Sequence, residues 1–326
     1  MTDHFAIAYG QNAEDVVLHR ALADVEAGFY VEVGANHPTE LSISRAFYDA
    51  GWRGLEIEPV EELASAFAAD RPRDQVVQAA VTDADVAEVT LHLIAGTGLS
   101  TLDDGVSAEH ATHGYVAREV AVPARRLAEL LDEAQPPDGT VHFMVVDTEG
   151  TEADVLASND WTRWRPWILV IEATRPLSTE PTHQAWEPAL VAAGYEFCLF
   201  DGVSRFYVAA EHADRLRDRL SAPANVLDGF TPHHWHRREA EFAATRAELE
   251  DLGRLQASTH DELIRWRGAA LTRWAEAATG GGPSAGVAGH EAARLRQELE
   301  ATQATLSWRV TAPLRLVQER RLRGRP

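Results

Sequence analysis

The sequence predicts an α/β fold, with a mostly parallel β-sheet covered by helices on both faces, followed by a helical C-terminal extension. Short apolar, β-branched runs alternate with amphipathic helical patterns over about the first 230 residues. Several of these runs end at a glycine or an acidic residue, and ligands bind at the carboxyl ends of strands in such sheets. The last two runs, 195–200 and 205–209, predict a closing β-hairpin.

The most informative stretch is residues 29–59, which reads as strand, tight turn, helix and strand. The turn after the first strand contains Gly34, Ala35 and Asn36, none of which is bulky, so its backbone is able to approach a ligand closely. Thr39 is expected to cap a helix that ends at Gly51. Glu58 follows the second strand, the position at which nucleoside-binding α/β folds hold ribose hydroxyls.

The same stretch favours S-adenosylmethionine over a dinucleotide. Pyrophosphate binding uses G-x-G-x-x-G, and only Gly34 stands in that register. Glu32, inside the first strand, suits a cationic amino-acid ligand better than a diphosphate. The alternative is an ordinary α/β core with a glycine turn.

Three further segments are candidates for the ligand crevice, each with a plainer interpretation. Gln11 either covers the cofactor or belongs to a helix that only covers the sheet. Asp83, after the third predicted strand (75–81), either meets an adenine amino group or is an exposed turn residue. The loop at 95–102 is hydroxyl-rich, and Ser100 and Thr101 are candidate substrate contacts.

Acidic residues end two later strands. Asp147 and Glu149 follow the run 141–146, and Glu172 ends the run 167–171, with Arg175 just beyond as a candidate substrate contact. Strand-end carboxylates suit a general base, a divalent-metal site, or both. Turn formation explains any one of them, but it explains all three poorly.

Composition limits the function classes. The net charge of −21 argues against a nucleic-acid partner. Mean hydropathy is −0.26, and with neither a signal sequence nor a membrane-spanning run the expected location is cytoplasmic. The single cysteine, Cys198, excludes an internal disulfide and predicts a small core residue.

The predicted organisation has four parts: a domain at 1–230, a helical extension at 231–278 suited to homo-oligomer formation, a glycine-rich linker at 279–289, and a short helix with an arginine-rich tail at 290–326. The tail either meets an anionic surface at the inner face of the plasma membrane, or a glycan-assembly partner, or has no partner.

Taken in order, six motifs resemble the FkbM family of S-adenosylmethionine-dependent methyltransferases over about residues 5–230. They are YGQNAED at 9–15, FYVEVGANHP at 29–38, GWRGLEIEP at 51–59, GLSTL at 98–102, DTEGTE at 147–152 and RPW at 165–167. The resemblance implies a Rossmann-like class I methyltransferase fold with seven strands, and O-methylation of sugars. It places cofactor contacts at Glu32, Gly34, Asn36 and Glu58. Many members carry a lysine two residues before the aspartate, where this chain has Val145, so a role for that lysine does not transfer.

The tail at 307–315 (SWRVTAPLR) is similar to a C-terminal signature of bacterial glycan-assembly proteins. The resulting hypothesis is a sugar O-methyltransferase in cell-surface polysaccharide synthesis, with a carbohydrate or glycolipid acceptor. Asp147, Glu149 or His37 is the candidate base, and Asp147, Glu149 and Glu172 are the candidate Mg²⁺ ligands. The rivals are an NAD-type Rossmann enzyme and a non-catalytic scaffold.

Overall fold

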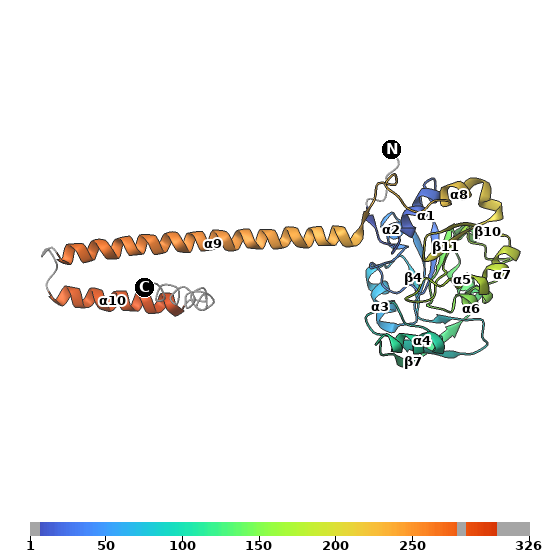
Figure 1. The fold of residues 1–326 in the computed structure, drawn as a ribbon, viewed down its shortest axis with the longest axis horizontal. Helices are drawn as coiled ribbons and strands as arrows, with labels where there is room; N and C mark the ends of the chain where they lie inside the picture. Colours follow the sequence, from blue (N-terminus) through green and yellow to red (C-terminus); the bar gives the residue numbers. More distant parts are fainter. Residues whose placement is uncertain (1–6, 279–284, 305–326) are drawn as a thin grey trace. The chain divides into compact units, whose positions relative to one another are not determined.

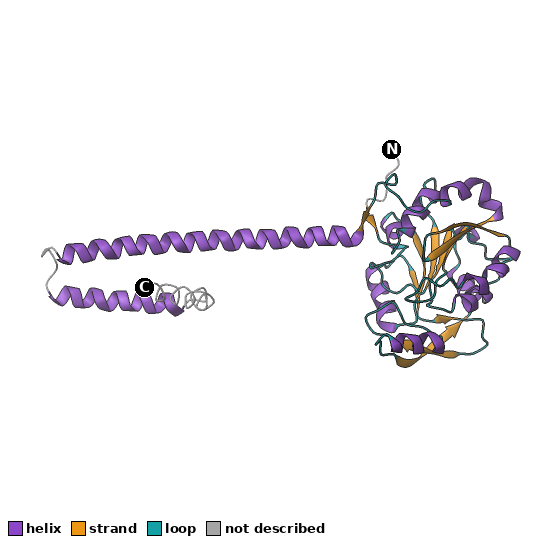
Figure 2. Cartoon of the chain, in the orientation of Figure 1, coloured by secondary structure: helices purple, strands orange, loops and turns teal. Residues whose placement is uncertain are grey.

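A computed structural model of the chain describes residues 7–278 and 285–304. The chain divides into two compact units, Met1–Glu241 and Phe242–Pro326. The first unit contains the described strands, and its sheet and surrounding helices are visible in Figures 1 and 2. The predicted α/β fold with a mostly parallel sheet is confirmed.

The main sheet has seven strands in the order β10-β11-β9-β8-β2-β3-β4. The five strands β9, β8, β2, β3 and β4 are parallel to one another, whereas β11 runs antiparallel to both β9 and β10. The strands are β2 (Phe29–Val33), β3 (Arg53–Ile57), β4 (Gln75–Val77), β8 (Phe143–Val146), β9 (Ile168–Glu172), β10 (Tyr195–Phe200) and β11 (Ser204–Ala209).

Two apolar clusters, one on each face, hold the sheet between helices, because alternate residues of a strand point to opposite faces. On β8, Met144 and Val146 belong to one cluster and Phe143 and Val145 to the other. The first cluster includes side chains of α5 (Leu127–Ala134), α6 (Glu152–Ala157) and α7 (Glu187–Ala192). The second includes side chains of α1 (Glu14–Leu22), α2 (Arg45–Asp49) and α8 (Ala213–Leu220).

A second, three-stranded sheet lies between β4 and β8 in the sequence. It has the order β5-β7-β6, formed by β5 (Ala80–Val81), β6 (Glu88–Leu93) and β7 (Arg118–Arg125). The run 75–81, predicted as one strand, is therefore two: β4 pairs with β3, and β5 leaves the main sheet to pair with β7. Helices α3 (Glu61–Asp70) and α4 (Asp104–Thr112) flank this insertion in the sequence.

The helix expected from Thr39 to Gly51 is much shorter than predicted. Only α2, five residues long, is helical, and Leu41 is exposed with a positive φ of 60°. The cause is a buried glutamate: Glu32 accepts hydrogen bonds from the backbone N–H groups of Ile43 (3.1 Å) and Ser44 (3.2 Å). These donors are taken by a side chain, so the segment before α2 follows an irregular path.

The remaining described elements are short apart from two helices. A two-stranded sheet pairs β1 (Ile7–Ala8) with β12 (Thr231–Pro232), and three 3₁₀ turns are at Pro137–Gly139, His183–Ala185 and Ala210–His212. Helix α9 runs over His233–Ala278 and α10 over Ala285–Ala304. None of the described helices is both long enough and apolar enough to cross a bilayer.

The predicted part boundaries remain predictions, with one difference in the linker. Residues 279–284 and the arginine-rich tail lie outside the described residues, but α10 begins at Ala285, within the range 279–289 that was expected to be linker. Residues 285–288 include two alanines, which have the highest helix propensity and offset the cost of Gly286.

Candidate functional site

A pocket opens at the carboxyl ends of the central strands β2, β3 and β8. Its empty space, open mouth included, is about 580 Å³, within the range of small-molecule sites. The wall comes from the segments that follow β2, β3 and β8, from the 97–102 loop and from the second sheet. The lining residues are Val33, Gly34, Asn36, Glu58, Pro59, Val60, Leu63, Ala79, Ala80, Val81, Leu91, Thr97, Gly98, Ser100, Thr101, Leu102, Asp147, Thr148, Glu149 and Thr151.

One side of the pocket is the turn after β2. The Asn36 backbone N–H donates to Glu58 Oε2 (2.7 Å), and the Val60 N–H donates to Oε1 (2.8 Å). Glu58 is buried, and this burial raises its pKa to about 7. Through these two hydrogen bonds, Glu58 holds the turn and the start of α3 in place while its side chain lines the pocket.

The glycine of this turn is required by its surroundings. Gly34 has φ +80°, and a Cβ built there would lie 1.8 Å from the backbone oxygen of Asp147. A side chain at this position is excluded by both conformation and space. The turn after β2 and the turn after β8 thus touch through their backbones.

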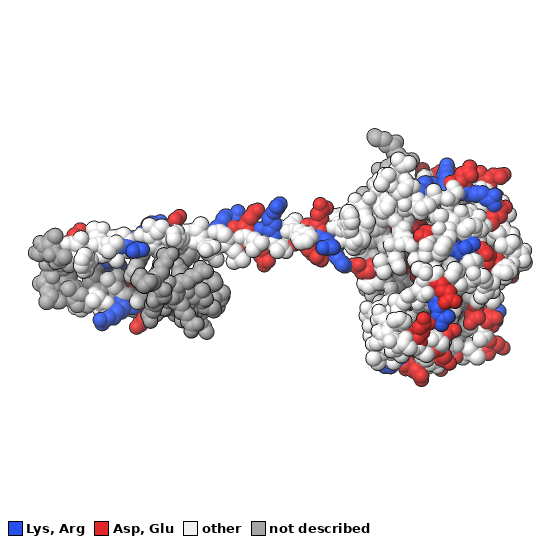
Figure 3. All heavy atoms as spheres, viewed as in Figure 1, with Lys and Arg blue, Asp and Glu red and all other residues white. Residues whose placement is uncertain are grey.

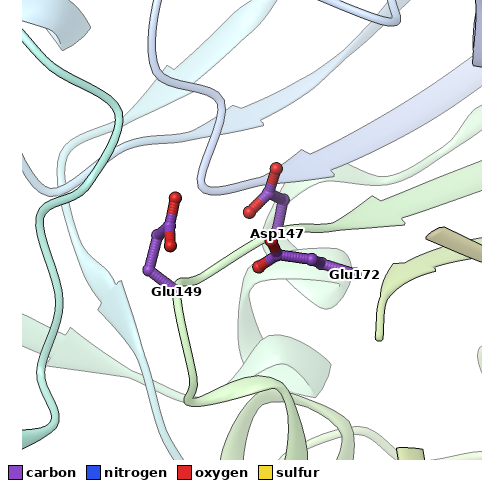
Figure 4. Close-up of side chains that lie close together, drawn as sticks. All are labelled: Asp147, Glu149 and Glu172. Atoms are coloured by element: carbon purple, nitrogen blue, oxygen red, sulfur yellow. The ribbon is translucent and has the colours of Figure 1, made fainter. Parts of the chain in front are cut away.

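The other side of the pocket carries the acids, shown in Figure 4. Asp147 follows β8, Glu149 lies two residues on, and Glu172 is the last residue of β9. One carboxylate oxygen from each lies within 4.8 Å of the others. Glu149 Oε2 and Glu172 Oε2 are buried without a hydrogen-bond partner among the described residues. The expected convergence of these three strand-end acids is observed.

The three acids retain protons more readily than ordinary carboxylates because they lack a countercharge. Burial, followed by the charge of Glu152, raises the pKa of Asp147 to about 6, although a hydrogen bond from Glu172 opposes the shift. Burial, followed by the charges of Asp147 and Glu152, raises the pKa of Glu149 to about 9. Burial and the same neighbours put the pKa of Glu172 well above its ordinary value. At neutral pH, Asp147 is therefore mainly ionised and Glu149 is mainly protonated.

Hydrogen bonds fix the turn that carries Asp147 and Glu149. Glu152 Oε1 accepts from the backbone N–H groups of Thr148 (3.1 Å) and Gly150 (3.0 Å). Thr101 Oγ1 donates to the Glu149 carbonyl (2.7 Å). Glu149 has φ 52°, a left-handed conformation that is costly for a residue with a Cβ, and such strain concentrates at functional sites.

Seven of the predicted site residues line the pocket: Gly34, Asn36, Glu58, Asp147, Glu149, Ser100 and Thr101. Glu172 belongs to the cluster of three acids but is not among the residues that line the pocket. Their individual roles remain predictions.

Three predicted residues near the β2 turn do not line the pocket. Glu32 is turned toward the segment at 42–44, as described above, and Ala35 is 5% exposed with its N–H donated to the Ile57 carbonyl (3.2 Å). His37 Nδ1 accepts from the backbone N–H groups at positions 39 (3.1 Å) and 40 (3.0 Å). The only lone pair of a neutral imidazole is thus engaged, so His37 is not placed to act as the base.

Three more lie away from the pocket wall for reasons of topology. Asp83 follows β5, which leaves the main sheet and takes this residue with it. Gln11 is exposed, in a turn where Glu14 Oε2 accepts from the Asn12 N–H (2.9 Å). Arg175 Nε is paired with Glu109 Oε2 at 2.6 Å.

Sequence reasoning missed the apolar wall. Val60, Leu63 and Leu91 line the pocket, but in the sequence they look like ordinary core positions of a helix and a strand. The only available signal was their closeness to Glu58 and to the 95–102 loop.

The charged side chains among the described lining residues of the pocket are all acidic. Among its described lining residues are three carboxylates and no Lys, Arg or His side chain. Acidic side chains are also prominent on the visible face of the first unit (Figure 3). Such a pocket attracts cations or neutral polar groups and disfavours phosphate.

The comparisons with known proteins agree with this geometry. A family model described as the methyltransferase FkbM domain matches residues 32–197, which include the β2 turn, Glu58 and all three clustered acids. No curated protein matches the chain. The family match covers slightly more than half of the 326 residues, and the chain belongs to the FkbM methyltransferase family.

Proposed function

We propose that this chain is an S-adenosylmethionine-dependent O-methyltransferase that acts on a sugar hydroxyl of a glycan, glycolipid or glycosylated metabolite in bacterial cell-surface polysaccharide biosynthesis. The observation that carries the proposal is an acidic pocket at the carboxyl ends of β2, β3 and β8, in a chain of a methyltransferase family. We also infer that the sheet is the Rossmann-like class I methyltransferase arrangement, since its first long strand, β2, is central and its last, β11, is an antiparallel insertion.

The lining residues fit this cofactor. Its sulfonium and amino groups are cationic, in keeping with the carboxylates of the wall, whereas the diphosphate of NAD would face them unfavourably. Glu58 is placed to meet ribose hydroxyls at the end of β3. The apolar side chains of Val60, Leu63 and Leu91 suit a purine ring.

Asp147 is the best-placed base. The bound cofactor supplies an electrophilic methyl group, and the acceptor hydroxyl must lose a proton as it attacks. With a pKa near 6, Asp147 is ionised at neutral pH, yet it is more basic than an ordinary aspartate. Glu172 is hydrogen-bonded to it, and Glu149, with a pKa of about 9, is protonated at neutral pH and able to donate a hydrogen bond to a sugar oxygen.

A divalent cation is the second candidate for activating the hydroxyl. The three converging carboxylate oxygens are the hard ligands that Mg²⁺ prefers. Glu149, with a pKa of about 9, would have to release its proton on binding, so cation uptake would strengthen as the pH rises. Base and cation mechanisms therefore predict different pH dependences.

Isothermal titration of the full chain with S-adenosylhomocysteine, with Mg²⁺ or with EDTA, tests the proposal. Saturable binding at one site per chain is expected, and an acceptor screen among nucleotide sugars and glycan fragments follows. Stronger binding or turnover with Mg²⁺ would favour the cation. Absence of binding under every condition would support the scaffold alternative, and NADH titration tests the dinucleotide alternative.

The proposal extends to location and assembly. We propose a peripheral contact of the arginine-rich tail with anionic lipid, measured by co-sedimentation with vesicles with and without phosphatidylglycerol. We also propose self-association through α9, on which Leu249, Leu263 and Trp274 are at least half exposed, measured by light scattering during size-exclusion chromatography.

A further inference from the structure

Arg71 lies at the centre of a buried polar network that the proposed mechanism does not use. Its side chain is fully buried, and it is the largest such side chain in the described structure. Nε donates to Asp74 Oδ2 (2.9 Å), while the Nη groups donate to oxygen atoms of β2, β3 and the segment before α2. These further acceptors are Pro38 O (3.2 Å), Ser42 Oγ (3.0 Å), Tyr30 Oη (3.2 Å), Ser44 Oγ (2.6 Å) and Glu56 Oε1.

The guanidinium also neutralises buried acids. Glu56 and Asp74 are ion-paired to it, and all three side chains are 0% exposed. Glu32 joins through Ser44, whose Oγ lies within hydrogen-bond distance of both the Glu32 and the Glu56 carboxyl groups. Burying one cation among several acids is costly unless every donor is used, and Arg71 has a partner for each of its five N–H bonds.

Two of these contacts reach the turn that lines the pocket. The turn begins at Gly34, whose N–H donates to the Ile57 carbonyl (3.0 Å). It continues through Asn36, held by Glu58, and ends at Pro38, whose carbonyl accepts from Arg71 Nη1. The same Nη1 holds Ser42, so Arg71 fixes the far end of the turn while β3 fixes the near end.

We propose that Arg71 is a positioning residue for cofactor binding: through Pro38 and Ser42 it holds the turn at 34–38 in the conformation that presents Asn36 to the pocket. This inference rests on the proposed function, because it assigns the pocket to S-adenosylmethionine. It reassigns Glu32 as well, from a ligand of the cofactor to a support of the same segment.

Two single-hydroxyl variants separate positioning from stability. Ser42→Ala removes an acceptor of Arg71 on the turn side, and Tyr30→Phe removes one on the strand side. Both hydroxyls are buried and both changes leave every charge in place. Each variant of the full chain is titrated with S-adenosylhomocysteine, melted thermally, and analysed by hydrogen exchange of peptides covering residues 34–44.

Both variants are expected to lower the melting temperature. Ser42→Ala should also raise the Kd for S-adenosylhomocysteine about fivefold, as expected for one hydrogen bond, and speed exchange at 34–44, whereas Tyr30→Phe should leave the Kd within about twofold. Should Ser42→Ala fail to fold, Ser42→Cys, of similar size but a weaker acceptor, takes its place.

Two results would overturn the inference, and they are distinguishable. If the wild-type chain binds and both variants bind as tightly, Arg71 supports the fold only. If the wild-type chain itself does not bind S-adenosylhomocysteine, the proposed function fails, and the positioning role falls with it.

Discussion

The first unit contains two groups of acids at neighbouring strands, and they differ in whether a cation lies among them. Glu32, Glu56 and Asp74 surround Arg71, whose guanidinium uses all its donors on this network. Asp147, Glu149 and Glu172 have no described ion pair, and two of their oxygens have no described partner. The first group contains a cation, although Glu56 Oε2 also has no described hydrogen-bond partner, and the second group contains no described cation.

This difference separates support from chemistry. Beside β2 and β3, burial raises the pKa of Glu56 and of Asp74, but the Arg71 charge opposes both shifts and the network holds the backbone. Beside β8 and β9 no described cation opposes the raised pKa values of Asp147 and Glu149, and such values are typical of a reactive or ligand-binding site. If this division is right, changes at the Arg71 group should affect stability and positioning, and changes at Asp147 should affect turnover.

The largest effect is expected where the turn after β2 touches the turn after β8. Gly34→Ala places a methyl group against the Asp147 carbonyl in a left-handed conformation, so the free energy of unfolding should fall by about 3 kcal/mol or more. Gly51→Ala is the control, since Gly51 also has a positive φ, +96°, but no atom within 4 Å of the added methyl; its cost should be about 1–2 kcal/mol. Equal losses in urea unfolding would show that the contact is unimportant.

Asp147→Asn should reduce turnover by roughly 10²- to 10⁴-fold, because it removes the proposed base, while S-adenosylhomocysteine binding persists. Asp83→Asn is the matched control, since Asp83 lies away from the pocket wall. Single-turnover rates measure the first effect and calorimetry the second. Full activity of Asp147→Asn would remove it as base and as metal ligand.

Glu58→Ala should weaken S-adenosylhomocysteine binding by about 1–3 kcal/mol, because a charged acceptor is lost and two backbone N–H groups are left unpaired. Glu61→Ala, an exposed change in the first turn of α3, should bind normally. Unchanged affinity of Glu58→Ala would place the cofactor elsewhere.

The smallest effect concerns pH. The pKa of Glu149 rises from an ordinary 4.5 to about 9, so between these values the folded chain binds a proton that the unfolded chain lacks. Stability from this group is therefore full below about pH 4.5 and is lost as the pH rises toward 9. Glu149→Gln should flatten this slope and raise stability at pH 8. A steeper slope in thermal melts would contradict the assigned protonation state.

Turnover should respond to the same chemistry. With Asp147 as base, activity should rise as the pH passes about 6 and then level off. A rise that continues toward pH 9 and is abolished by EDTA would instead favour the cation, because Glu149 must then be ionised.

Local patterns predicted the strands and the strand-end acids, because apolar runs and topology place Glu58, Asp147 and Glu172 without reference to distant partners. They failed where a long-range contact decides the structure. The helix expected after Thr39 is displaced by Glu32, and β5 leaves the main sheet for β7, whose register partner for Ala80 is Ala124. The sequence also does not single out Arg71, because its partners are spread between positions 30 and 74.

The second sheet has a consequence for how the pocket wall can vary. It supplies Leu91, Ala80 and Val81 to the pocket, whereas the acids come from the main sheet. Substitutions or length changes in this insertion can therefore alter the shape of the wall while the acids and the Arg71 network stay in place. The fold is in this sense modular, because the insertion can change the apolar wall of the pocket while the acids of the main sheet are retained.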